Sequence, residues 1–327
     1  MSDQPLVTIG IPTRNRAGLL AEALQSALNQ TYENIEIIVS DNASEDGTAN
    51  YLNTAIDTRL KRIRQDKVLP MKQNWQCCLQ RASGDYFMLL SDDDVLLPTA
   101  VESLIGMFEH GKRPEFVYGS VVFVDHTSGD VPSEIVMRGP KQESGLDLII
   151  GLLQWKRAVP LCGALFPTLP LLNSGGFIKG NLDLACDVSA WVRLIHAGSI
   201  VRCAPTVVAR YSFYSANTTN RTSTQTWVED LTHLEQLIIR QVCFANAFTK
   251  FRIKHLAYAY KFYPILNQAE TVGGTLAQRL RTASSLVKFI PLFMASGMPL
   301  RVLVPMMRII LSQSAYTGLR RVMRRSR

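Results

Sequence analysis

The fold of this chain is decided by the stretch Tyr86-Phe87-Met88-Leu89-Leu90-Ser91-Asp92-Asp93-Asp94, which Val95-Leu96-Leu97-Pro98 follows. An apolar run that ends in three adjacent acids predicts a buried strand with a cation site at its end. Like charges this close repel each other, and a divalent cation offsets the repulsion. Neither His nor Cys flanks the acids, so Mg²⁺ or Mn²⁺ with oxygen ligands fits best. The alternative is a solvated turn that caps a helix beginning near Pro98.

Around this stretch, residues 1 to 130 alternate β-rich runs with helical patterns. Strands are expected at Val7–Pro12, Ile35–Ser40, Tyr86–Leu90 and Phe116–Val124, and helices at Ala17–Gln30, Asp46–Ile56, Met71–Ala82 and Pro98–Glu109. That order predicts an α/β fold with a mostly parallel sheet flanked by helices. Ligands bind at the carboxyl ends of the strands in such sheets. The polar clusters at residues 40–47 and 91–94 are therefore expected to line one crevice that holds a nucleotide.

Four motifs, in the expected order, resemble those of family 2 glycosyltransferases with the GT-A (Rossmann-like) fold. They are residues 7–16 (VTIGIPTRNR), residues 41–48 (DNASEDGT), residues 84–98 around the acids, and Gly175-Gly176-Phe177 with the later Asp187 to Leu194. The resemblance covers roughly residues 5 to 218. It implies an inverting transferase that uses a nucleotide-sugar donor.

The resemblance also implies roles at the nucleotide. Pro12, Thr13, Asn15 and Arg16 are expected to surround the nucleobase, and Asp41 to accept a hydrogen bond from it. A carboxylate can accept only from a ring that presents an N–H, so Asp41 favours uracil or thymine over cytosine. The alternative for Asp41 is an Asx-type turn after a strand. We assign Ser44 and Asp46 first to capping of the helix that follows.

For the metal, the spacing to Pro98 puts Ser91 where many relatives carry their first Asp. Asp93 is then the expected ligand of Mn²⁺ or Mg²⁺. Asp92 would face ribose or a metal-bound water, and Asp94 would support the loop. Because Ser91 leaves one carboxylate fewer, we expect weak metal binding that the diphosphate completes.

Asp187 is the candidate general base, because it lies four residues before Trp191, as in the family. Inversion at an anomeric carbon needs one carboxylate to take the proton of the acceptor hydroxyl. Asp183 is the rival base, since it would lie one turn earlier on the same face if this stretch is helical. The structural alternative is that Asp187 caps the helix that contains Trp191.

The stretch Tyr211-Ser212-Phe213-Tyr214 departs from the family pattern. Ser212 and Tyr214 occupy positions where many relatives have Arg and His side chains that contact the metal or the diphosphate. Tyr214 is kept as a supporting residue, and Arg210 or Arg221 are alternative sources of positive charge. His126 and His196 are interpreted as structural.

Charge and hydropathy predict both the domain organisation and a membrane surface as a partner. The 327 residues predict two domains, a catalytic domain at 1–225 and a helical C-terminal region at 226–327. Residues 271–327 hold ten Lys or Arg and no acid, which accounts for the whole net charge of +8. Between these bases the longest uncharged stretch, Phe289–Leu300, is shorter than the ~20 residues that span a bilayer. Residues 279–327 therefore predict amphipathic segments on an anionic membrane surface.

Two other interpretations of this tail remain open. One is a packing face for the catalytic domain or for a second copy in a homo-oligomer. The other, a nucleic-acid tail, is disfavoured because apolar residues separate the bases and few aromatic residues could stack. No signal peptide is expected, since the first apolar run is short and follows Asp3. Six cysteines without paired metal spacing suit reduced thiols in a cytosol.

These features predict a peripheral enzyme on the cytoplasmic face of a bacterial inner membrane. The family resemblance implies that it would move one hexose or deoxyhexose from a UDP- or dTDP-sugar to a polyprenyl-diphosphate-linked glycan for O-antigen, capsule or exopolysaccharide synthesis. The alternatives are a sugar-nucleotide nucleotidyltransferase, whose Gly-rich, Arg-containing phosphate loop is absent near the start, and a non-catalytic membrane-associated scaffold. A dinucleotide oxidoreductase is disfavoured because no Gly-x-Gly-x-x-Gly follows the first strand.

Overall fold

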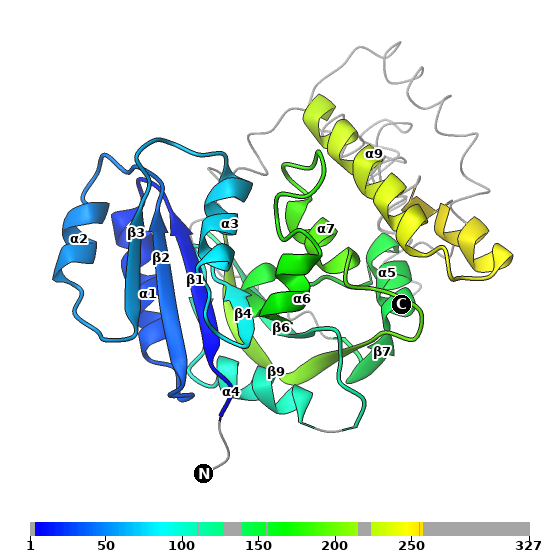
Figure 1. The fold of residues 1–327 in the computed structure, drawn as a ribbon, viewed down its shortest axis with the longest axis horizontal. Helices are drawn as coiled ribbons and strands as arrows, with labels where there is room; N and C mark the ends of the chain where they lie inside the picture. Colours follow the sequence, from blue (N-terminus) through cyan, green and yellow to red (C-terminus); the bar gives the residue numbers. More distant parts are fainter. Residues whose placement is uncertain are drawn as a thin grey trace, which may run out of the picture. The chain divides into compact units, whose positions relative to one another are not determined.

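The computed structural model describes residues 4–109, 111–126, 139–154, 156–214, 224–254 and 256–257. The chain divides into two compact units, Met1–Ile149 with Arg157–Arg221, and Ile150–Lys156 with Thr222–Arg327. The first unit carries the sheet, and the second carries helix α9 (Thr224–Gln241) (Figure 1). The basic tail at 279–327 lies outside the described residues, and the division at 225/226 stays a prediction.

The first unit is built on a nine-stranded sheet in the order β3-β2-β1-β4-β8-β6-β9-β5, with β7 also paired to β9. The strands are β1 (Val7–Thr13), β2 (Ile35–Asp41), β3 (Leu60–Arg64), β4 (Tyr86–Leu89), β5 (Val95–Leu96), β6 (Val117–Asp125), β7 (Gln142–Ser144), β8 (Ala164–Pro167) and β9 (Ile200–Phe213). Pairs β1·β2, β1·β4, β2·β3 and β6·β9 are parallel, whereas β4·β8, β6·β8, β5·β9 and β7·β9 are antiparallel. The α/β class is confirmed, but the sheet is mixed rather than mostly parallel.

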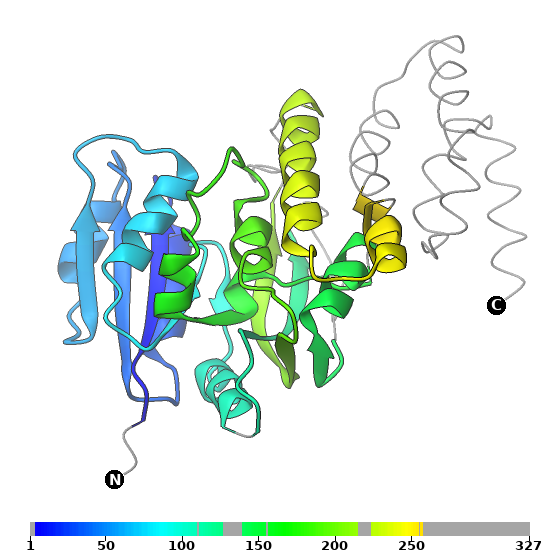
Figure 2. The ribbon, with the colours of Figure 1, turned by 45° about the vertical axis from the view of Figure 1, so that its right-hand side comes forward.

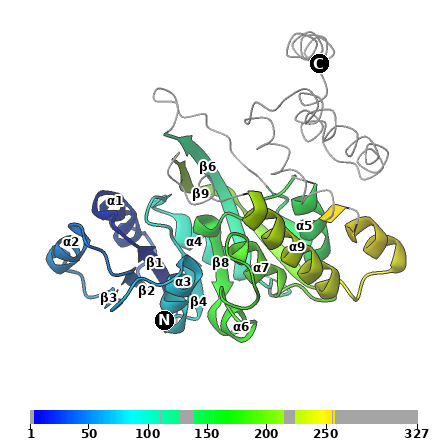
Figure 3. The ribbon, with the colours of Figure 1, turned by 90° about the horizontal axis from the view of Figure 1, so that it is seen from above.

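Helices cover the sheet of this unit. They are α1 (Ala17–Leu28), α2 (Thr48–Thr54), α3 (Met71–Gln80), α4 (Ala100–Ile105) with the 3₁₀ turn Gly106–Phe108, α6 (Thr168–Asn173) and α7 (Cys186–Val192), while α5 (Gly145–Leu153) runs from the first unit into the second. Ile9 and Ile11 of β1 share a core cluster with Leu20 and Leu24 of α1. Gly10 points to the other face because side chains alternate along a strand. A Cβ there would lie 2.7 Å from the Cys78 Cβ on α3. Helices α1 and α3 therefore lie on opposite faces of β1 (Figure 2, Figure 3).

Strands β1 and β2 are buried at every residue, as expected for parallel strands with helices on both faces. Register pairs Thr13 with Asp41, so both strands end at the same edge of the sheet. Hydrogen bonds join the loop that follows β1 to the loop that follows β2. Asn15, at φ +53°, donates its N–H to Ser44 Oγ at 2.9 Å and accepts the Glu45 N–H at 2.8 Å.

Asp46 lies at the start of two helices. Its carboxylate accepts the N–H of Thr48 at 2.9 Å and that of Ala17 at 3.1 Å, the first residues of α2 and α1. The expected cap at Ser44 is wrong, because its hydroxyl accepts the N–H of Asn15 in the β1–α1 loop instead. Asp46 therefore fixes the entry angle of both helices beside the edge where the strands end.

The second unit exposes aromatic side chains next to bases. After α9, residues 247–254 are helical, and Phe248 and Phe251 are 76% and 61% exposed. Lys250, Arg252 and Lys254 are exposed in the same turns. No helix in the described part of the chain is long and apolar enough to cross a bilayer.

Candidate active site

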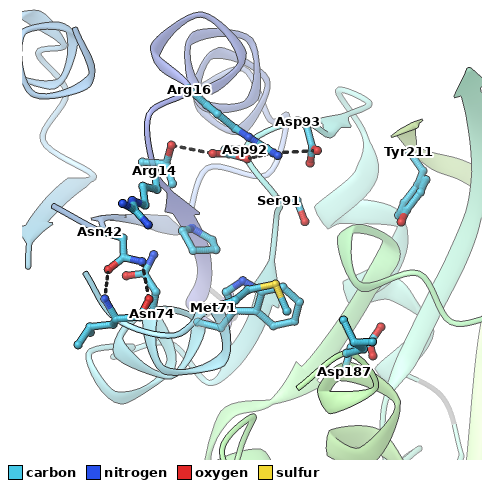
Figure 4. Close-up of a pocket in the computed structure, with 15 residues that line it drawn as sticks. Arg14, Arg16, Asn42, Met71, Asn74, Ser91, Asp92, Asp93, Asp187 and Tyr211 are labelled. Carbon is cyan, nitrogen blue, oxygen red and sulfur yellow. Dashed lines mark hydrogen bonds and ion pairs between the residues drawn. The ribbon is translucent and has the colours of Figure 1, made fainter. Parts of the chain in front are cut away.

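A pocket of about 400 Å³ opens where β1, β2 and β4 end (Figure 4). Its lining residues come from three places: the ends of these strands with the loops that follow, the start of α3 with the residues before it, and α7 with the loop before it and β9. They are Pro12, Thr13, Arg14, Arg16, Asn42, Leu69, Met71, Asn74, Trp75, Ser91, Asp92, Asp93, Leu184, Asp187 and Tyr211. Six of the predicted site residues, Pro12, Thr13, Arg16, Asp92, Asp93 and Asp187, are thus brought together.

Arg16 and two acids form one wall. The Arg16 Nη1 lies 3.0 Å from Asp92 Oδ1 and 3.0 Å from Asp93 Oδ2, and Thr13 Oγ1 donates to Asp92 Oδ2 at 2.7 Å. Burial raises the pKa of Asp92 although Arg16 opposes this. Burial alone would lower the pKa of Arg16, but the charges of Asp92 and Asp93 outweigh it and raise that pKa. In this wall the Arg16 guanidinium is therefore shared between two carboxylates.

Asp94 points away from the pocket. It is 2% exposed, and its Oδ1 accepts the Ser212 N–H of β9 at 2.9 Å. Burial and the neighbouring Asp93 raise the pKa of Asp94 to about 8. Tyr211, adjacent to Ser212, lines the pocket, and burial raises its pKa well above the usual range. Asp94 thus fastens the acidic loop to the strand that carries Tyr211.

On the opposite flank, Asn42 lines the pocket and Asp41 lies behind it. Asn42 exchanges two hydrogen bonds with the backbone of Leu69, at 2.9 and 2.8 Å. Asp41 is 1% exposed, accepts the Ser44 N–H at 2.9 Å and pairs with Arg64. Neither Asp41 nor Asn15 is among the lining residues.

Asp187 lies in the first turn of α7, where its Oδ1 accepts the N–H of Val188 at 2.7 Å. Figure 4 shows Asp187 and Tyr211 on the side of the pocket opposite Arg14 and Asn42. The rival base Asp183 precedes α7, so the expected position one helical turn before Asp187 does not hold. Asp183 is instead exposed and lies 2.7 Å from Lys72 Nζ, outside the pocket lining.

The start of α3 provides a wall that the sequence analysis did not assign. Met71, Asn74 and Trp75 line the pocket from one helical face, at spacings of three and four residues. Asn74 is buried and bonds to Ser40, with Ser40 Oγ donating to Asn74 Oδ1 at 2.7 Å and Asn74 Nδ2 donating to Ser40 O at 3.1 Å. The helical spacing was visible in the sequence, but not the face that it turns toward the site.

The comparisons with known proteins agree with this geometry. Residues 8–152 match the family described as Glycosyl transferase family 2. These residues are a family 2 glycosyltransferase domain. An uncharacterized glycosyltransferase of Rickettsia prowazekii is 28% identical over 221 residues, or 66% of each chain. The Escherichia coli protein named UDP-Glc:alpha-D-GlcNAc-diphosphoundecaprenol beta-1,3-glucosyltransferase WfaP is 30% identical over 134 residues, 41% of this chain and 50% of that one.

The similarity extends to the fold beyond the family 2 domain. The crystal structure of Staphylococcus aureus TarS residues 1–349 with UDP-GlcNAc superposes with a TM-score of 0.64 at 15% identity, covering 91% of this chain and 82% of that one. At this identity the match shows the fold, which is GT-A-like. The chain spans between 28% and 66% of the length of the first curated relatives it matches.

The family 2 domain offers few protein ligands for a metal. In the part of the chain that the structure describes, no three His, Cys, Asp or Glu side chains gather as a metal site. Asp92 and Asp93 nevertheless present carboxylate oxygens at the pocket. Mg²⁺ is commonly held by one or two carboxylates and completed by substrate phosphates. The two residues fit an ion of this kind, in competition with Arg16.

Tyr214 lies beside this wall, in a smaller pocket of about 70 Å³ that also includes Asp93, His126 and Arg210. Its ring stacks on His126 with centroids 4.4 Å apart and planes 4° apart. Burial and the charge of Asp93 raise the pKa of Tyr214. Tyr214 and Arg210 thus line a pocket next to the acids, whereas Arg221 lies outside the described residues.

Proposed function

We propose that this chain is an inverting glycosyltransferase that moves one sugar from a nucleotide sugar to an acceptor hydroxyl. The observation that carries the proposal is the placement of Asp187 in the same pocket as Arg16, Asp92 and Asp93. One pocket thereby contains a carboxylate that suits the role of base and a separate charged wall that suits the diphosphate. The family 2 match of residues 8–152 supports this assignment.

In this mechanism Asp187 takes the proton of the acceptor hydroxyl as its oxygen attacks the anomeric carbon. The bond from that carbon to the nucleoside diphosphate breaks on the opposite face, so the configuration inverts. Arg16 supplies positive charge to the departing diphosphate, and Thr13 orients Asp92. Asp93 and Asp92 would hold a divalent cation, which would supply further positive charge to the departing diphosphate.

A UDP- or dTDP-sugar is the proposed donor. A carboxylate has about four acceptor positions, and Ser44 and Arg64 account for two of those on Asp41. Asp41 therefore keeps capacity for a ring N–H that approaches past Asn42. The name of the E. coli relative, which specifies UDP-Glc, supports a uridine donor.

A lipid-linked glycan at the cytoplasmic face of a bacterial inner membrane is the proposed acceptor. The E. coli relative is named for a diphosphoundecaprenol-linked acceptor. The exposed Phe248 and Phe251, set among three bases, suit an anionic membrane surface. The predicted membrane segments at 279–327 would add to this surface, and the product would enter surface polysaccharide synthesis.

Calorimetry with UDP, dTDP, CDP and GDP, each with and without Mn²⁺, tests the proposal on the native chain, Asp93→Ala and Asp183→Ala. We expect UDP or dTDP to bind in a Mn²⁺-dependent way, Asp93→Ala to lose that dependence, and Asp183→Ala to behave as native. Absence of nucleotide binding would favour the scaffold. Release of pyrophosphate from UTP and a sugar 1-phosphate would favour the nucleotidyltransferase.

A further inference from the structure

We propose that Trp75 is the platform on which the donor sugar stacks. The inference rests on the proposed function and deepens it, because it assigns the sugar end of the donor to a named side chain. The ligand class is a pyranose with one face of C–H groups, which an aromatic ring covers. Nothing in the family 2 match assigns a role to this residue.

Asn74 and Trp75, on the face of α3 that lines the pocket, contact different parts of the sheet and its loops. Asn74 bonds to Ser40 on β2, the strand whose end carries Asp41 and Asn42. Trp75 instead contacts Phe177, with ring centroids 5.7 Å apart at 89°. Phe177 in turn lies 6.3 Å from Phe87 of β4, the strand that precedes the acids. Trp75 is therefore displaced from the nucleobase flank toward β4.

The loop that supports the indole is fixed from two sides. Gln76, the next residue on α3, accepts the Phe177 N–H through Oε1 at 3.0 Å. Gly176 has φ +56°, and a Cβ there would collide with the Gln76 amide. After α7, Arg193 donates to the carbonyl of Gly176 and, at 3.1 Å, to that of Lys179. The indole thus rests on a rigid backing before any ligand arrives, which lowers the entropy lost on binding.

The sugar of a bound donor is expected to lie beside the Trp75 indole. In a nucleotide sugar the diphosphate joins the nucleoside to the sugar, so the sugar extends from the wall of Asp92 and Asp93 toward Asp187. Besides Trp75, the apolar residues Leu69, Met71 and Leu184 line the pocket, together with Pro12 of β1, which is expected at the nucleobase. Figure 4 shows Met71 between Asn74 and Asp187. Leu69 is held by Asn42 on the nucleobase flank, which leaves Trp75, Met71 and Leu184 for the sugar.

Calorimetry with UDP, UDP-Glc and UDP-GlcNAc in Mn²⁺ separates the sugar from the nucleotide. The variants are Trp75→Phe, Trp75→Leu and Trp75→Ala, and Gln73→Ala is the matched control on an exposed face of α3. The quantity compared is the ratio of the UDP Kd to the Kd of the tighter UDP-sugar. Leu keeps apolar volume against Phe177 without an aromatic face, so it distinguishes stacking from packing.

We expect Trp75→Leu and Trp75→Ala to reduce this ratio about five- to ten-fold while the Kd of UDP stays within about two-fold of native. Trp75→Phe should keep most of the ratio, and Gln73→Ala all of it. An unchanged ratio in Trp75→Leu, or a loss of UDP affinity equal to that of the UDP-sugar, would overturn the platform. Failure of the native chain to bind either UDP or dTDP would instead overturn the proposed function, so the two failures are distinguishable.

Discussion

Arg16 Nη1 lies 3.0 Å from Asp93 Oδ2, and the same nitrogen lies 3.0 Å from Asp92 Oδ1. One guanidinium therefore offsets part of the negative charge of the two acids. A divalent cation bound by these acids would compete with Arg16 for the same oxygens. An Arg16 side chain displaced in this way would be available to the diphosphate of a donor.

Replacement of Arg16 by Ala should consequently have opposite effects on the metal and on the nucleotide. We expect the affinity of the nucleotide-free protein for Mn²⁺ to rise about three- to ten-fold, since the acids lose a partly exposed counter-charge. UDP affinity should fall, because the diphosphate loses a cation. Titration of free Mn²⁺ by electron paramagnetic resonance measures the first effect. Exposed Lys67→Ala is the control, and unchanged Mn²⁺ affinity in Arg16→Ala would contradict the competition.

Replacement of Asp187 by Asn should abolish transfer without loss of donor binding. The amide cannot accept the hydroxyl proton, so kcat should fall at least about 100-fold. The measurement is UDP release from a UDP-sugar with bacterial membranes as the acceptor source. Asp183→Asn, which removes an exposed acid paired with Lys72, should keep kcat within about two-fold. A larger loss in Asp183→Asn than in Asp187→Asn would reverse the assignment of the base.

Glu36 lies near the start of β2, at the end of the strand away from the pocket. Its pKa predicts how the free energy of unfolding depends on pH. Burial would raise its pKa, but hydrogen bonds from Lys61, Ser83 and Thr8 outweigh burial and lower the pKa from 4.5 to about 2. This carboxylate therefore stabilises the fold above pH 4.5, and its contribution is lost as the pH falls from 4.5 toward 2. Glu36→Gln should lower the free energy of unfolding at pH 7 by about 2 kcal/mol.

Urea unfolding between pH 2 and pH 7 tests the role of Glu36. The variant should show a flatter dependence than the native chain below pH 4.5. Exposed Glu33→Gln serves as the control and should follow the native curve. An identical slope for Glu36→Gln and the native protein would show that the hydrogen-bonded carboxylate is not the group that titrates.

The exposed aromatic pair of the second unit predicts lipid binding. We expect the full chain to sediment with vesicles of 30% phosphatidylglycerol in phosphatidylcholine, as about that much anionic lipid suffices for bound bases to contribute. Phe248→Glu combined with Phe251→Glu should reduce the bound fraction at least about five-fold. Leu169→Glu, at a residue 68% exposed in the first unit, is the matched control. Equal binding of the double variant and the native chain would limit the membrane contact to other residues.

The first half of the fold could be predicted because its strands carry unbroken apolar runs. Strands β1, β2 and β4 and helices α1 and α3 begin at the residues expected and end within two residues of the expected positions. Strand β3 was missed because Leu60–Arg64 holds three bases, which an edge strand tolerates but periodicity does not reveal. Strand β9 was missed because its burial alternates irregularly.

The site was predictable to the extent that its residues follow strands. Asp92, Asp93 and the loop after β1 were expected at one edge, and they line the pocket. No role at the site was predicted for Trp75 or Tyr211, because the sequence of a helix or strand does not show which of its faces lines a pocket. Asp41 was expected at the nucleobase, but its pairing with Arg64 is a contact between neighbouring strands that sequence spacing does not encode.

The hydrogen bond from the Ser212 N–H to Asp94 joins residues 118 positions apart in the chain. During synthesis on the ribosome, β1 to β4 can pair long before Ser212 has emerged. The acidic loop then remains unfastened until β9 completes the sheet, so the nascent chain has its strands in place before it has a finished site. Enzyme activity should consequently appear only in chains extended past β9, and truncation before residue 200 should yield inactive chains.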